Sequence, residues 1–125
     1  MASALFLDIE GAFPNAVTDR LLHNMRTRWV PEEYVRFVGR LLEDQKTRLK
    51  FDDYISEPVP IDNGIGQGDP ISMILYLFYN ADLLDVPTGK ELAIAFVDDV
   101  SFCAEGATFE DTHRTLHDMM TQLGD

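Results

Sequence analysis

The segment LAIAFVDDVSF, residues 92–102, consists of two short apolar runs separated by a pair of aspartates. Each run has the length of a β-strand, so the segment predicts a β-hairpin with Asp98 and Asp99 at its bend. A similar run, ALFL at residues 4–7, ends directly in Asp8. Because an ionised carboxylate is costly to bury unless something neutralises it, we expect the three acids to share a partner.

A divalent metal ion is one partner that fits three carboxylates. Converging carboxylates repel one another, and hard oxygen ligands of this kind favour Mg²⁺ or Mn²⁺. The alternative is ordinary turn chemistry, because aspartate is common at strand ends and hairpin bends. Each feature alone favours a turn, and only their joint occurrence keeps the metal site open as an equal interpretation.

Helices are expected between these strands. Apolar residues at helical spacing predict one helix from Val17 through Trp29. Pro31 begins a second helix, whose inner face we expect to consist of Tyr34, Val38, Leu41 and Leu42. The sequence DP at residues 69–70 predicts the start of a third helix.

The rest of the pattern completes an α+β order. Residues 47–51 and 55–61 predict a second hairpin. Thr108 and Asp111 form a capping box for the last helix, which we expect Gly124 to end. The order strand, helices, hairpin, helix, hairpin, helix predicts a mostly antiparallel sheet with helices packed on one face.

A glycine-rich stretch, NGIGQGDPIS at residues 63–72, leads into the third helix. Three glycines in five residues allow a close backbone approach, and a helix N-terminus suits a phosphate. The stretch lacks the lysine of a P-loop and the glycine spacing of a dinucleotide fingerprint. Taken alone, it is typical of a turn followed by a helix cap.

The composition excludes several classes of protein. The net charge of −12 and only 10 lysines and arginines argue against an autonomous nucleic-acid binder. One cysteine excludes an internal disulfide. No apolar run is long enough to span a bilayer, and the N-terminus lacks a signal peptide, so we expect an intracellular protein, either nuclear or cytoplasmic.

Together, three segments resemble the catalytic motifs of reverse transcriptases. LDIEGAF at residues 7–13 is similar to the first motif, GQGDPIS at residues 66–72 to the second, and FVDD at residues 96–99 to the third. Their order and spacing are most similar to the non-LTR, LINE-type retrotransposon branch, and the likeness covers nearly the whole chain. It implies a polymerase palm with a ferredoxin/RRM-like core over residues 1–125, with the fingers largely absent and the thumb absent.

The resemblance also implies roles for individual residues. Asp8 and Asp98 would ligate two Mg²⁺ or Mn²⁺ ions, with Asp99 as a third carboxylate and the carbonyl of Ile9 as a further ligand. Phe13 would be the steric gate against a ribose 2′-hydroxyl. The remaining implied site residues line the nucleotide pocket or lie near the primer and template: Gln67 and Gly68 for the nucleotide, Phe96 and Gly66 for primer and template.

The implied partners are an RNA template, a DNA primer and a deoxynucleoside triphosphate, with no membrane. The missing fingers and thumb would carry the basic residues that hold phosphates, which accounts for the acidic charge. We therefore expect the isolated palm to be inactive as a polymerase.

Two alternatives remain open. The first is a non-catalytic remnant or interaction module that keeps the fold. The second is a phospho-receiver domain, which also has an acidic pocket at strand ends. In that class the paired acids come early and a lysine follows late, whereas here the pair comes late and no lysine follows it.

Overall fold

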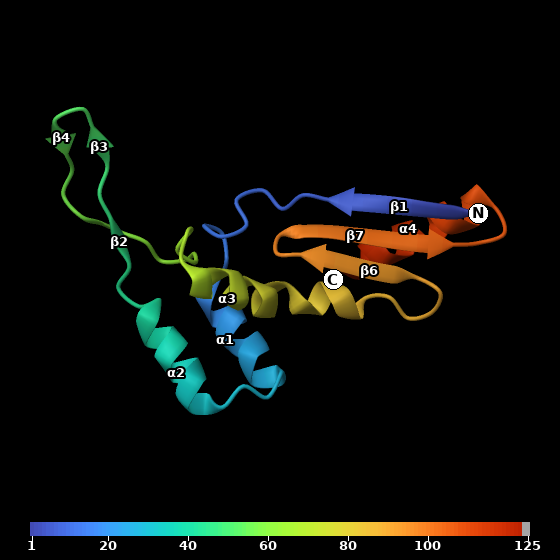
Figure 1. Ribbon diagram of the computed structural model, residues 1–125, viewed down its shortest axis with the longest axis horizontal. Helices are drawn as coiled ribbons and strands as arrows, with labels where there is room; N and C mark the ends of the chain where they lie inside the picture. The colour runs from blue at the N-terminus through green and yellow to red at the C-terminus, as the bar shows by residue number, and fades with distance from the viewer. Residues whose placement is uncertain (124–125) are drawn as a thin grey trace. The chain divides into compact units, whose positions relative to one another are not determined.

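The computed structural model describes residues 1–123, so the expected helix end at Gly124 lies outside the described residues. The chain divides into two compact units (Figure 1). Unit 1 contains Met1–Ala12 and Asn80–Asp125, and unit 2 contains Phe13–Tyr79. None of the helices in the described range is long and apolar enough to cross a membrane.

Unit 1 is built on a three-stranded antiparallel sheet. Its strands are β1 (Ala2–Leu7), β6 (Leu92–Phe96) and β7 (Asp99–Glu105), in the order β1-β7-β6. The short 3₁₀-helix η1 (Ala81–Asp85) precedes β6. The hairpin predicted from residues 92–102 is therefore confirmed as β6 and β7. The N-terminal strand β1 pairs with β7.

One face of this sheet forms the core of unit 1. Side chains alternate along each strand, and Val100, Phe102 and Ala104 of β7 are buried against α4 (Phe109–Leu123). Leu116 and Met119 of α4 complete this cluster. A helix on one face of an antiparallel sheet agrees with the predicted α+β class.

The start of α4 is held by the predicted capping box. The backbone N–H of Asp111 donates to Thr108 Oγ1 at 3.1 Å, and the N–H of Thr108 donates to a carboxylate oxygen of Asp111 at 3.3 Å. The hydroxyls of Ser3 and the buried Thr112 lie 2.7 Å apart and connect β1 to the helix.

Unit 2 contains the helices α1 (Thr18–Thr27), α2 (Glu32–Leu41) and α3 (Pro70–Asn80). The predicted start of α3 is confirmed, because a carboxylate oxygen of Asp69 accepts the N–H of Ile71 at 3.1 Å. Asn24 is 1% exposed, and its amide donates to the carbonyl oxygen of Tyr79 at 3.0 Å. This bond ties α1 to the end of α3.

The predicted end of α1 is wrong by two residues. The helix stops at Thr27, and Trp29, expected on its inner face, is 91% exposed with φ +64°. Val30 precedes Pro31, and a residue in that position is driven away from helical backbone angles. The chain therefore leaves the helix before Trp29.

The predicted inner face of α2 is confirmed for two of its four residues. Val38 and Leu42 are buried, whereas Tyr34 and Leu41 are exposed and Val35 is buried in their place. All of these residues are apolar and at helical spacing, so periodicity alone could not distinguish the buried ones from the exposed ones.

The predicted second hairpin is an arm made of four short strands. β2 (Lys46–Thr47) pairs with β5 (Val59–Pro60), and β3 (Lys50–Phe51) pairs with β4 (Tyr54–Ile55). The pairing register shifts by one residue between the two pairs, as at a β-bulge. Figure 1 shows the arm leading away from the helices of unit 2.

Candidate functional site

In unit 1, the strand register brings the acidic segments to the same end of the sheet. Leu7, the last residue of β1, pairs directly with Val100 of β7. Asp8 follows Leu7 and Asp99 precedes Val100, so the two acids extend neighbouring strands at one end (Figure 1). Directly opposed residues of antiparallel strands have Cα atoms about 5 Å apart. Acids far apart in the sequence are therefore neighbours in the fold.

Asp98 lies in the two-residue turn that joins β6 to β7. Phe96 and Asp99 form the last pair of the hairpin, which leaves Val97 and Asp98 as the turn. Val97 has φ +57°. A β-branched side chain in this left-handed region costs about 1–3 kcal/mol and is found mainly where the surrounding structure holds it. The turn next to the aspartates is therefore strained.

The three carboxylates do not gather on one point. Asp8 and Asp99 are exposed and Asp98 is half-buried, so the expected burial holds only in part. Within residues 1–123, no group of three or more His, Cys, Asp or Glu side chains is arranged to hold a metal ion. Negative charges on neighbouring residues repel one another, which favours separated side chains. The donors fit a divalent ion by their chemistry, although they are not preassembled.

The face of the sheet opposite α4 is apolar near these acids. Phe96 is 77% exposed on β6, and Phe6 is 78% exposed on β1. Phe96 pairs with Asp99, while Phe6 pairs with Ser101, two residues further along β7. Ile9, the other residue implied as a ligand, follows Asp8 and is half-buried. Unit 1 thus holds Asp8, Ile9, Phe96, Asp98 and Asp99 in one region.

In unit 2, the glycine-rich stretch is fixed to the segment that contains Phe13. The N–H of Ile65 donates to the carbonyl oxygen of Phe13 at 2.8 Å, and the Phe13 ring stacks on Tyr76 at 5.0 Å. Gly64 has φ +111°, and a Cβ there would lie 2.7 Å from the carbonyl oxygen of Pro14. Only glycine allows this close approach.

The residues implied for nucleotide and template binding lie on this stretch. Gly66, Gln67 and Gly68 are all exposed. Gly66 and Gln67 line a small cavity of about 220 Å³ together with Pro14 and Ile65. Gly68 has φ +93°, and a Cβ added there would lie in open space. Unit 2 thus brings Phe13 and the glycine-rich stretch together.

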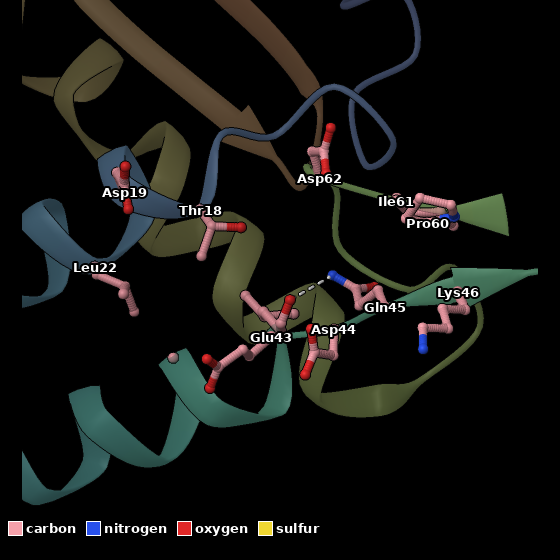
Figure 2. A pocket seen from close by; sticks show the side chains of 12 residues that line it. Thr18, Asp19, Leu22, Glu43, Asp44, Gln45, Lys46, Pro60, Ile61 and Asp62 are labelled. Atoms are coloured by element: carbon pink, nitrogen blue, oxygen red, sulfur yellow. Dashed lines mark hydrogen bonds between the residues drawn. The ribbon is translucent and has the colours of Figure 1, made fainter.

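Unit 2 also contains a cavity of about 370 Å³ that the sequence did not indicate. Figure 2 shows its acidic lining, which includes Asp19, Asp44 and Asp62, with Lys46 as the basic side chain. None of the residues implied by the resemblance lines it.

Two residues of the two regions were not predicted from the sequence: Tyr76, which supports Phe13, and Val97, which carries the strained turn. Gly64 is one of the three glycines expected to allow a close backbone approach, and it does so at Pro14. The Asn-Gly pair at residues 63–64 was a signal for Gly64, since it marks a turn. Valine has no such signal, because it is among the residues least suited to positive φ.

The comparisons with known proteins give one similarity. The chain is 24% identical over 128 residues to a Drosophila melanogaster protein described as "Probable RNA-directed DNA polymerase from transposon BS". The match covers 97% of this chain. The similarity relates the chain to reverse transcriptases. The chain spans 14% of the length of that relative, and no family model matches it.

Proposed function

We propose that this chain is the palm region of a non-LTR retrotransposon reverse transcriptase, with the nucleotidyl-transfer site at the sheet end of unit 1. The observation that carries the proposal is the pairing of Leu7 with Val100, which makes Asp8 a neighbour of Asp99. The similarity to a transposon polymerase over nearly the whole chain supports it independently.

The resemblance to reverse transcriptases implies the roles of the acids in this proposal. Asp8 and Asp98 would hold two Mg²⁺ or Mn²⁺ ions, with Asp99 and the carbonyl of Ile9 as further ligands. The ions, when bound, would supply activation of a primer 3′ hydroxyl and stabilisation of the leaving pyrophosphate. An exposed site is open to such a primer, and the apolar face around Phe96 would lie beside its end.

The residues proposed to bind the incoming nucleotide lie in unit 2. Phe13, held by its stacking on Tyr76, would limit the space available at the sugar of the incoming deoxynucleoside triphosphate. Gln67 and Gly68 are exposed and free to contact the nucleotide, while Gly66 would approach the template. Binding of an RNA template and a DNA primer is part of this proposal. The polymerase activity of any longer protein that contains this chain is part of it as well.

One observation favours a second candidate, a non-catalytic module that keeps the palm fold. The three carboxylates are not gathered into a metal-binding group within the described residues. The two candidates differ in whether the acids bind a metal ion with useful affinity.

Titration calorimetry with Mn²⁺ separates the two candidates. We expect Asp98→Ala to weaken Mn²⁺ binding at least tenfold, which corresponds to about 1.4 kcal/mol. Asp53→Ala is the matched control, because Asp53 is also the second residue of a two-residue hairpin turn. The polymerase proposal fails if the wild-type chain binds no Mn²⁺, or if both variants lose affinity equally.

A further inference from the structure

The arm of unit 2 carries basic side chains at alternate positions. Lys46, Arg48 and Lys50 supply three of the chain's 10 lysines and arginines within five residues. Alternate residues of an extended strand point to the same side. The composition argued against a basic face, but the strand geometry produces a small one.

The pairing of the arm supports this placement. Lys46 pairs with Pro60 and Lys50 pairs with Ile55, so neither basic residue lies opposite an acid. Between these pairs, the N–H of Ser56 donates to the carbonyl oxygen of Leu49 at 2.9 Å, which continues the β3–β4 ladder toward Arg48. Residues 48 and 49 thus lie between the two paired strands β2 and β3.

These three side chains have no carboxylate partner in the described part of the chain. By contrast, Arg26 donates to both carboxylate oxygens of Glu32 at 3.0 Å, and Arg36 lies 3.8 Å from the same group. Acids flank the basic face at both ends and limit it to a narrow strip. Asp44 and Asp62 line one cavity with Lys46 at the base of the arm, and Asp52, Asp53 and Glu57 lie at its tip and in its bulge.

We propose that this basic strip binds the phosphate backbone of a single-stranded nucleic acid. Three cations that repeat every two residues lie about 6.6 Å apart, a spacing comparable to that of successive phosphates in an extended strand. Phe51 and Tyr54 at the tip are 66% and 64% exposed and are available for base stacking, which favours a single strand over a duplex.

The inference deepens the proposed function, on which it rests for the class of ligand: the arm would hold the RNA template. It does not depend on the metal ions, because phosphate neutralisation by Lys and Arg is a separate source of affinity. The binding assay is therefore run in EDTA, which removes divalent metal ions. Its result then does not depend on whether the metal-site proposal is correct.

The experiment measures fluorescence anisotropy of a labelled oligouridylate over a salt titration. The variant Lys46→Gln/Arg48→Gln/Lys50→Gln should bind at least tenfold more weakly than the wild-type chain. Its slope of log affinity against log salt should fall by about 2, since each phosphate contact to a single strand contributes about 0.7.

A matched control removes the same charge elsewhere. Arg40→Gln/Lys90→Gln/Arg114→Gln changes three exposed cations outside the arm and should alter affinity less than twofold. Circular dichroism checks that both variants fold. Equal losses in the two variants, no binding by the wild-type chain at low salt, or equal competition by polyglutamate would each overturn the inference.

Discussion

Gly64 is the residue at which the glycine-rich stretch is most tightly constrained. Its N–H donates to the carbonyl oxygen of Ala16 at 2.8 Å, and its own carbonyl accepts the amide of Gln45 at 3.0 Å. The backbone therefore passes close to Pro14 and has no room for a side chain. This contact holds the stretch against the segment that carries Phe13.

Substitution of this glycine should destabilise the protein beyond the cost of its backbone angle. Gly64→Ala places a Cβ 2.7 Å from a carbonyl oxygen and should lower the free energy of unfolding by at least about 2 kcal/mol. Gly68→Ala is the control, because its φ of +93° is also unfavourable but no atom lies within 4 Å. Urea denaturation should give a loss of about 1 kcal/mol for that variant. Equal losses would show that the close approach is absent.

The three aspartates show which features of the candidate site could be predicted from the sequence. Asp8, Asp98 and Asp99 were recognised because each interrupts an apolar run, and the register makes Asp8 a neighbour of Asp99. Their exposure was not foreseen, because an apolar run shows that a strand is buried on one face without showing what lies beyond its end. Whether these acids bind metal stays a prediction.

At the scale of elements, prediction succeeded where local chemistry fixes the end of an element. The capping box at Thr108 and the cap at Asp69 are formed by neighbouring residues, so a few residues determine them. Prediction was only half correct for α2, where Val38 and Leu42 are buried as expected but Tyr34 and Leu41 are exposed. Several apolar residues there share helical spacing, and only tertiary packing decides which of them are buried.

The junction of α1 and α2 is held by an ion pair whose effect on stability depends on pH. The hydrogen bond from Arg26 lowers the pKa of Glu32 below its usual value of 4.5. Its stabilisation is therefore present above pH 4.5 and is lost as the pH falls through the lowered pKa. Both side chains are about half exposed, so the effect is small.

Glu32→Gln tests this pH dependence. The variant should be less stable than the wild-type chain in urea denaturation at pH 7, and the difference should close as the pH falls below 4.5 toward 3. Glu33→Gln, on the same helical turn, should show a smaller difference at pH 7. A difference for Glu32→Gln that stays constant with pH would contradict the role of the ion pair.

At the scale of the whole molecule, the division into two units was not predictable from periodicity. The sequence pattern shows which residues are apolar and at what spacing, but the pairing of β1 with β7 joins the two ends of the chain. The cost of burying a carboxylate and the family resemblance both connected Asp8 with the aspartates at 98 and 99. The resemblance also implies that Phe13 and Gln67 act with these acids, which stays a prediction.

Both units carry exposed apolar side chains. Phe6, Ile94 and Phe96 are exposed on the sheet of unit 1, and Tyr34 and Phe37 on α2 of unit 2. Patches of this kind are common where a protein surface is covered by a further domain or partner.

The most direct test of the central claim is paramagnetic broadening by Mn²⁺ in amide NMR spectra. We expect the strongest broadening at residues 7–9 and 96–100, which surround the proposed metal site at the end of the unit 1 sheet. Broadening centred instead on Asp19, Asp44 and Asp62, the acids of the cavity in unit 2, would contradict the assignment of the site.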